Sequence, residues 1–220
     1  MDVRFVLASA SPARQSVLRA AGIEPVVRVP GVDEEAVRTS LTDPAPDELV
    51  TALATAKAEA VVEQVAAEFE EAVVVGCDSM LWTSGPDGYE LVGKPPTPDS
   101  AARRWSRMAG GTGELLTGHA VLRVGNGSVV ARGSDHLSTT VRFGEPSEPE
   151  LDSYIATGEP LRVAGGFTLD GLGGWFVTGV DGDPSSVIGI SLPLTRTLLA
   201  GVGVGVVSMW NHTAEESCNS

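Results

Sequence analysis

Apolar and polar residues follow each other along this chain in two kinds of pattern. Short continuous apolar runs predict strands buried on both faces, and apolar residues spaced three or four apart predict helices. The predicted strands cover residues 3–7, 25–29, 72–77, 115–124, 128–143, 175–180 and 202–207. The predicted helices cover residues 12–21, 46–67, 99–108, 148–156 and 192–199, and an acidic loop with a short helical piece covers 31–44. Residues 84–88 predict a turn between two short strands.

The order of these elements predicts the fold class. Strands and helices alternate in the first half of the chain, and a hairpin is predicted around Gly125-Asn126-Gly127. This mixture favours an α/β fold with a mixed sheet. A chain of 220 residues is long enough for one substantial domain or two small lobes. Because no repeat or strong linker interrupts it, we expect a single α/β domain over residues 1–212, followed by a C-terminal tail over 213–220.

Small hydroxyl side chains and an arginine stand where the first strand leads into the first helix. Ser11 is predicted to be the N-cap, with Pro12 at the first helical position. Free N–H groups at a helix start attract anions, and Ser9 and Ser11 add hydroxyl donors. Arg14, in the first turn, offers a bidentate fork to a phosphate. The segment therefore predicts a phosphate site; a plain helix cap with an exposed arginine is the alternative.

Acidic side chains in two places predict metal or proton chemistry. Asp78 follows the apolar run 72–77, and ligand sites in α/β sheets lie beyond the carboxyl ends of strands. At that place a carboxylate can hold a metal or take a proton from water. Glu34 belongs to the acidic stretch Asp33-Glu34-Glu35, and carboxylate oxygens bind Mg²⁺ or Mn²⁺. An aspartate that turns the chain and a solvated acidic loop are the respective alternatives.

Lysine is rare in this chain. Of the 15 basic residues, 13 are arginines, and Lys57 and Lys94 are the two lysines. Lys57 lies among small residues of a predicted helix, which suits close packing with one cation directed into a cleft. Lys94 stands before Pro95 and Pro96, which fix the backbone at a corner. A lysine supplies a compact point charge, so both are candidates for chemistry; a surface lysine and a simple turn are the alternatives.

Charge and cysteine content narrow the classes of partner and compartment. A formal net charge of −14 argues against polymeric nucleic acid and anionic membranes as partners, but leaves room for a mononucleotide with a metal ion. No apolar run is long enough to span a membrane, and no basic region with an apolar stretch begins the chain. Cys77 and Cys218 lie in surroundings that disfavour a disulfide. We therefore expect a cytoplasmic protein. His119 and His136 fall in predicted strands, and we expect them to have structural roles.

The short motifs carry more information together than singly. In order, they read Leu7-Ala8-Ser9-Ala10-Ser11-Pro12-Ala13-Arg14, Asp33-Glu34, Ala56-Lys57-Ala58, Gly76-Cys77-Asp78-Ser79, Gly93-Lys94-Pro95, Gly158-Glu159-Pro160, Ala164-Gly165, Gly182-Asp183, Val187-Ile188-Gly189 and Leu192-Pro193-Leu194. This series resembles the Maf family of nucleoside triphosphate pyrophosphatases, and the resemblance extends from about Leu7 to about Trp210.

The resemblance implies a fold, an activity and a set of partners. The implied fold is two-lobed, with an elongated mixed β-sheet flanked by helices and a central cleft, similar in shape to inosine triphosphate pyrophosphatases. The implied reaction is hydrolysis of a nucleoside triphosphate to a nucleoside monophosphate and pyrophosphate with a divalent metal cation, Mg²⁺ or Mn²⁺. Members are cytoplasmic and often homodimeric. Their inferred roles are removal of unwanted nucleotides and a brake on septum formation.

The resemblance also implies roles for single residues. Ser9, Ser11 and Arg14 match the phosphate-binding stretch of the family. Glu34 and Asp78 match its acidic, metal-holding pair, and Asp78 also matches its proton acceptor. Lys57 and Lys94 match its active-site lysines.

Four positions depart from common members of the family. Ala13 stands where many carry a second arginine, and Gly113 where many carry a histidine. Val163 replaces a common lysine, and Asp170 replaces a common glutamine near the base. The subgroup associated with thymidine and uridine triphosphates uses that arginine and that glutamine, so the sequence leaves the nucleobase open.

Two other functions fit the same residues. One is a nucleotide-binding regulator of cell division with little turnover. The other is a purine-type house-cleaning pyrophosphatase of related shape. The intact set of Glu34, Lys57, Asp78 and Lys94 favours the enzyme, because a binder need not keep a water-activating acid. The order of the motifs argues against the purine-type relative.

Overall fold

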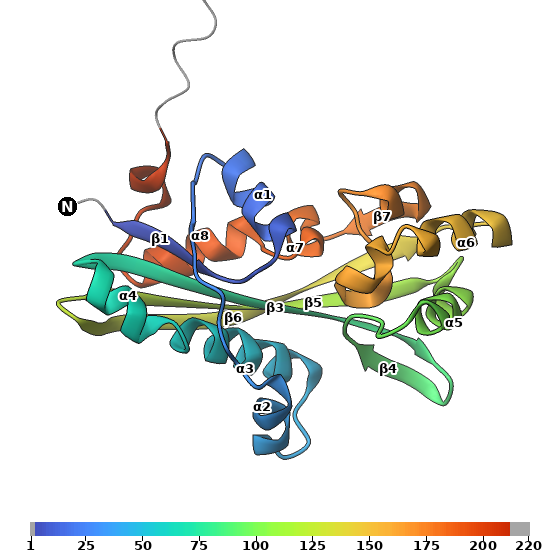
Figure 1. Cartoon of the computed structure of the whole chain (residues 1–220), viewed down its shortest axis with the longest axis horizontal. Helices are drawn as coiled ribbons and strands as arrows, with labels where there is room; N and C mark the ends of the chain where they lie inside the picture. Colours follow the sequence, from blue (N-terminus) through green and yellow to red (C-terminus); the bar gives the residue numbers. More distant parts are fainter. Residues whose placement is uncertain (1–2, 212–220) are drawn as a thin grey trace, which may run out of the picture.

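A seven-stranded mixed sheet extends through the length of the molecule (Figure 1). The computed structural model describes residues 3–211, so the predicted tail at 213–220, with Cys218, lies outside the described residues. The strands are β1 (Arg4–Ala8), β2 (Val26–Val27), β3 (Glu71–Gly85), β4 (Gly88–Val92), β5 (Thr112–Gly125), β6 (Ser128–Phe143) and β7 (Val177–Asp181). Their order is β2-β1-β3-β5-β6-β7, with β4 also pairing with β3. The predicted α/β class with a mixed sheet is confirmed.

Three long antiparallel strands, β3, β5 and β6, connect two lobes. In the first lobe, β1 pairs in parallel with both β2 and β3. Helices α1 (Pro12–Ala20) and α8 (Leu192–Gly201) lie on one side of this sheet, and α3 (Pro46–Glu59) and α4 (Val62–Glu68) lie on the other (Figure 1). The second lobe holds β4, β7, α5 (Pro98–Met108) and α6 (Glu148–Ala156). The short helices α2 (Glu34–Ser40) and α7 (Pro184–Ile188) lie nearer the junction.

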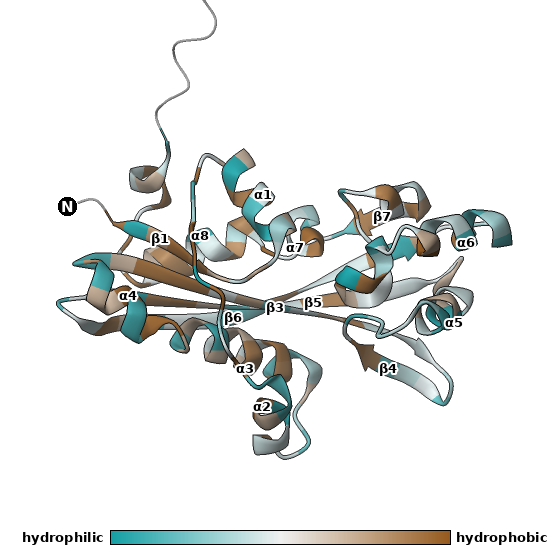
Figure 2. Ribbon diagram, in the orientation of Figure 1, coloured by the Kyte–Doolittle hydropathy of each residue, from teal (hydrophilic) through white to brown (hydrophobic). Residues whose placement is uncertain are grey.

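The first lobe is stabilised by apolar clusters on both faces of its sheet. On one face, Leu7 and Val75 pack with Leu18 of α1 and Leu199 of α8. On the other face, alternate strand residues such as Val74 pack against α3 and α4. Figure 2 shows the resulting concentration of apolar residues in the central strands. Side chains of successive strand residues point to opposite faces, so a strand covered on both sides must be apolar throughout.

The core of the second lobe is aromatic. Trp105 on α5 makes edge-to-face contacts with Phe143, Tyr154 and Phe176, at centroid distances of 5.7, 6.0 and 5.9 Å. Such contacts add to the free energy of apolar burial. This core anchors the segment 157–176, which contains three 3₁₀ turns: Glu159–Arg162, Ala164–Gly166 and Leu172–Phe176.

Several predicted boundaries are wrong. The helix predicted over 46–67 is two helices, α3 and α4, separated at residues 60–61, where Val61 turns into the core. The strand predicted over 72–77 continues to Gly85, because β3 leaves β1 and pairs with β4 instead. Residues 172–176 form a 3₁₀ turn, so β7 begins only at Val177.

The strand predicted over 202–207 is also wrong. Gly203 has a φ of +79°, a left-handed conformation that interrupts any strand. Val202 and Val204 are buried against the first-lobe core, and a 3₁₀ turn at Val206–Met209 follows. The alternation of glycine and valine fits a strand by period, but these valines cover a core rather than pair with a neighbour. Among residues 3–211, no helix combines the length and apolar character needed to cross a membrane.

Candidate active site

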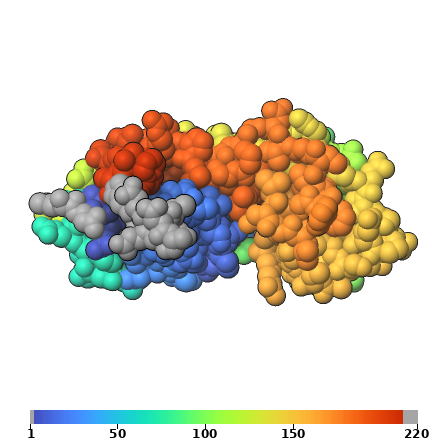
Figure 3. Space-filling view, turned by 90° about the horizontal axis from the view of Figure 1, so that it is seen from above, coloured from blue at the N-terminus to red at the C-terminus, as the bar shows by residue number. Residues whose placement is uncertain are grey.

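A cleft of about 1400 Å³ lies where the two lobes meet. Seen from above, the N-terminal segment in blue faces the segment around residues 160–170 in orange across the waist of the molecule (Figure 3). The site residues predicted from the sequence all line this cleft: Ser9, Ser11, Arg14, Glu34, Lys57, Asp78 and Lys94. The structure thus brings them together, while their individual roles stay predictions.

The floor of the cleft is a segment of β3 that lies between two pairing partners. On one side, β3 pairs with β1 as far as Gly76, opposite Ala8, and with β4 only from Leu81 onward. Asp78 lies in the interval between these two registers. The sequence predicted this aspartate just past the end of a strand, but it lies in the middle of a continuous one. Asp78 instead lies beyond the carboxyl end of the neighbouring strand β1, whose pairing with β3 stops at Gly76.

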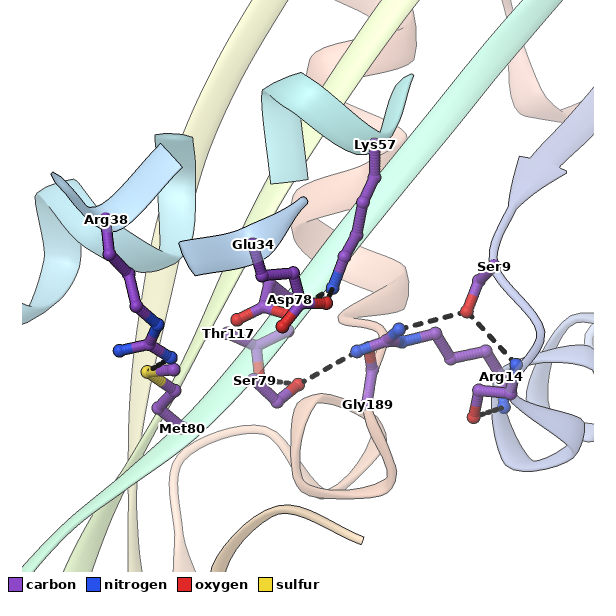
Figure 4. Close-up of polar contacts among 11 residues, drawn as sticks. Ser9, Arg14, Glu34, Arg38, Lys57, Asp78, Ser79, Met80, Thr117 and Gly189 are labelled. Carbon is purple, nitrogen blue, oxygen red and sulfur yellow. Dashed lines mark hydrogen bonds and ion pairs between the residues drawn. The ribbon is translucent and has the colours of Figure 1, made fainter. Parts of the chain in front are cut away.

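Lys57 binds both acidic residues of the site (Figure 4). Its Nζ lies 2.5 Å from Asp78 Oδ1 and 2.7 Å from Glu34 Oε1. The Lys57 and Asp78 side chains are only 12% and 10% exposed, whereas that of Glu34 is 49% exposed. One ammonium group is therefore shared by a carboxylate from α2 and a carboxylate from β3.

Lys57 reaches Asp78 because α3 packs unusually close to the sheet. A Cβ atom at Gly76 would lie 2.2 Å from the carbonyl oxygen of Ala54, and one at Gly118 would lie 2.2 Å from that of Val50. Gly118 is the β5 partner of Asp78. The two glycines therefore let the helix backbone contact the sheet on both sides of the aspartate.

The cationic surroundings shift the acidity of Glu34. Partial burial raises its pKa, but the hydrogen bond from Lys57 and the charges of Lys57, Arg38 and Lys94 outweigh that effect. The pKa of Glu34 therefore lies below its ordinary value, and the carboxylate is ionised at neutral pH. The Asp33 side chain, by contrast, caps α2 by accepting hydrogen bonds from the N–H groups of Glu35 and Ala36, at 3.1 and 3.0 Å.

Arg14 connects three parts of the cleft. Its Nε donates to the Gly189 carbonyl at 2.7 Å, Nη1 to Ser9 Oγ at 3.0 Å, and Nη2 to Ser79 Oγ at 3.2 Å. Ser11 caps α1 by accepting from the Arg14 N–H at 3.4 Å. The predicted cap is confirmed, and the guanidinium is held by protein groups rather than directed into solvent.

Sequence reasoning missed other cleft residues. Arg38, one turn after Glu34 on α2, lines the cleft and donates to Met80 Sδ at 3.6 Å. Glu159 organises the opposite wall: it accepts from Thr168 Oγ1 at 2.6 Å and from the Gly173 N–H at 3.1 Å. The four-residue spacing from Glu34 is a signal that could have found Arg38. Glu159 belongs to the motif Gly158-Glu159-Pro160, but the motif indicates no role for it, because its partners lie nine to fourteen residues away.

The sequence model of a family described as "Maf-like protein" matches residues 4–202. The chain belongs to the Maf family.

Relatives within the family cover almost the whole chain. A protein of Saccharopolyspora erythraea named nucleoside triphosphate pyrophosphatase is 72% identical over 208 residues, which cover 94% of this chain and 97% of the relative. A Nocardia farcinica protein of the same name is 59% identical over 97% of this chain and 100% of its own length. A Mycolicibacterium gilvum protein, also named nucleoside triphosphate pyrophosphatase, is 53% identical over 95% of this chain and 99% of its own length.

The positions that depart from common Maf sequences do not share one environment. Ala13, Val163 and Asp170 line the cleft. Gly113 instead lies in the second-lobe core, where a Cβ atom would come within 2.9 Å of the Leu81 side chain. A histidine at position 113 would therefore require this core to rearrange.

Proposed function

We propose that this chain hydrolyses a nucleoside triphosphate to a nucleoside monophosphate and pyrophosphate, with a divalent metal held by Glu34 and Asp78. One observation carries the proposal. The Asp78 carboxylate lies at the cleft floor with Oδ1 bound to Lys57, while Oδ2 is buried without a hydrogen-bond partner among residues 3–211. A buried carboxylate oxygen left in this state is suited to receive a proton or a ligand. The names of the relatives support the same reaction.

In the proposed reaction, water attacks the α-phosphorus. The new bond joins the water oxygen to the α-phosphorus, and the bond between that phosphorus and the α,β-bridging oxygen breaks. Asp78 Oδ2 accepts the proton of the water, and pyrophosphate leaves with the bridging oxygen. The ion pair with Lys57 keeps the Asp78 carboxylate in one orientation and leaves Oδ2 as its unpartnered oxygen.

The acidic pair fits a hard divalent cation. Mg²⁺ is commonly held by one or two carboxylates and completes its coordination with substrate phosphates and water. Glu34 and Asp78 supply two carboxylates within reach of one ammonium group. The described residues contain no group of three or more His, Cys, Asp or Glu side chains that could hold a metal alone. A bound Mg²⁺ or Mn²⁺ would supply charge neutralisation on the phosphate oxygens, as in other phosphoryl-transfer sites.

The cations of the cleft are suited to a polyphosphate. Positively charged side chains line the cleft, among them Lys57 at the floor, Lys94 at the rim, and Arg38. Arg14 fixes Ser9 and the loop at Gly189, and its charge adds to that of the start of α1. Charge that develops on the departing pyrophosphate is stabilised by such fixed groups, because they need no reorganisation.

The proposal extends to the setting of the reaction. We propose that the protein acts in the cytoplasm, as a homodimer, to remove non-canonical or excess nucleotides. Size-exclusion chromatography with light scattering tests the dimer. Nucleotide pools measured in cells with and without the gene test the role.

The deciding experiment is pyrophosphate release from a panel of canonical and modified nucleoside triphosphates, with Mg²⁺, with Mn²⁺ and with a chelator. Wild type is compared with Asp78→Asn and with Asp152→Asn, a matched change at an exposed position of α6. We expect turnover that needs the metal, falls by about 100-fold or more in Asp78→Asn, and persists in Asp152→Asn. Retained nucleotide binding without turnover on any substrate would instead favour the regulator of cell division.

A further inference from the structure

Two adjacent buried residues of α5 hold two different segments of the cleft wall. Arg104 Nη1 donates to the Gly93 carbonyl at 2.7 Å, and Trp105 Nε1 donates to the Gly166 carbonyl at 2.8 Å. Gly93 directly precedes Lys94, and the Gly166 turn follows the cleft-lining Val163 and Ala164. Arg104 is itself absent from the cleft lining and has no part in the proposed chemistry.

The two held segments also contact each other. The Gly93 carbonyl accepts a second hydrogen bond, from the Gly165 N–H at 3.2 Å. A Cβ atom at Gly166 would lie 2.9 Å from Pro95 Cγ, so the turn and the corner are in close contact. The Gly93 carbonyl, at the corner before Lys94, is therefore held by Arg104 from α5 and by Gly165 from the segment 157–176.

Arg104 is a charged residue in a buried position of α5. The Arg104 residue is only 8% exposed, and burial lowers its pKa by removing water from the guanidinium. Its neighbour Arg103 on the same helix is exposed, as most arginines are. Removing a charged group from water costs free energy, which its hydrogen bonds must offset. An apolar residue would avoid that cost, but it could not donate a hydrogen bond. Here the charged donor holds the backbone carbonyl of Gly93, directly before the exposed Lys94.

We propose that Arg104 is a positioning residue that acts through the Gly93 carbonyl to hold Lys94 at the rim of the cleft. The inference rests on the proposed function, because Lys94 is taken to bind the phosphates of the substrate. The Lys94 side chain has four torsions of its own, but the backbone position from which it extends is set by Arg104. Loss of this hydrogen bond displaces the start of the side chain, and with it the ammonium group.

The test is a double-mutant cycle with Arg104→Gln and Lys94→Met. Two quantities are measured for wild type, both single variants and the double variant: steady-state turnover of the preferred nucleoside triphosphate, and affinity for a non-hydrolysable analogue by calorimetry. Arg103→Gln is the matched control for the loss of one charge on α5. Arg104→Lys is a second variant, because its ammonium can still donate to the Gly93 carbonyl.

We expect Arg104→Gln to lower kcat/KM by about tenfold in the wild-type background and by less than about twofold once Lys94 is Met. Arg104→Lys should recover most of the loss, and Arg103→Gln should show none. Equal losses in both Lys94 backgrounds, or no loss, would overturn the inference. If Arg104→Gln does not fold, the same cycle with Arg104→Lys decides, since its smaller loss must also vanish in Lys94→Met.

Failure of the proposed function gives a different pattern. In that case wild type itself releases no pyrophosphate, and the cycle is evaluated on analogue affinity alone. Coupling between Arg104 and Lys94 in binding would still support the inference, and independent effects on binding would still overturn it.

Discussion

Lys57 and Asp78 form an ion pair at the floor of the cleft, with Nζ 2.5 Å from Oδ1 and both side chains close to nine-tenths buried. They come from a helix and a strand that are 21 residues apart in the sequence. The same ammonium group also binds Glu34, so it balances part of the negative charge that would otherwise repel a triphosphate. The pair therefore connects the stability of the first lobe to the proposed chemistry.

Replacing Lys57 by Met should damage both turnover and stability. The variant leaves the Asp78 carboxylate buried and unpaired, which should lower the free energy of unfolding by about 3 kcal/mol. Turnover should fall by about 100-fold, because the phosphates lose a fixed cation. Urea denaturation and pyrophosphate release measure the two effects. Adding Asp78→Asn should restore stability but not turnover; a single variant as stable as wild type would contradict the importance of this pair.

Replacing Gly76 by Ala should separate α3 from the sheet. The new methyl group would lie 2.2 Å from the Ala54 carbonyl oxygen, so the helix must move. We expect a loss of about 1–3 kcal/mol in the free energy of unfolding, from overpacking. Turnover should also fall, since Lys57 moves with the helix. Gly201→Ala, at a position with open space around it, is the control for the denaturation experiment and should not lower stability.

Replacing Arg14 by Lys tests whether geometry matters beyond charge. A lysine keeps the positive charge but cannot donate to Gly189, Ser9 and Ser79 together, because it has no planar fork. We expect kcat/KM to fall by about tenfold or more. Arg19→Lys, on the same helix but exposed and paired with Glu24, should leave the rate unchanged. A fully active Arg14→Lys enzyme would show that charge alone suffices.

His119 should make the protein less stable in weak acid. Burial lowers the pKa of its imidazole to about 4, from an ordinary value of 6.5. Its Nε2 accepts from the Ser191 N–H at 2.8 Å, which requires the neutral ring. Between these two pH values the unfolded chain binds a proton that the folded chain does not, so stability falls as the pH drops through this window.

The effect of His119 is measurable by denaturation at several pH values. Its contribution to the loss between pH 7 and pH 4 should be about 3 kcal/mol, because one pKa unit corresponds to about 1.4 kcal/mol. His119→Gln should flatten the pH dependence, even if it lowers stability at neutral pH. His136→Gln controls for removing a histidine from a partly exposed strand position. An unchanged slope in His119→Gln would contradict the assignment.

The sequence by itself predicted most elements and a set of residues that all line the cleft. Local patterns suffice for this, because a strand buried on both faces must be apolar and a helix start needs a cap such as Ser11. The hairpin at 125–127 is likewise encoded in its turn residues. The scarcity of lysine indicated Lys57 and Lys94, which both line the cleft.

Only the tertiary structure decided how these residues meet. The approach of α3 depends on Gly76 and Gly118, whose lack of side chains has meaning only once a helix lies over them. The break between α3 and α4, and the failure of 202–207 to form a strand, depend on which core each apolar residue covers. Periodicity shows that a residue is buried but not against what. The site therefore follows from contacts between segments far apart in the chain, which no local pattern records.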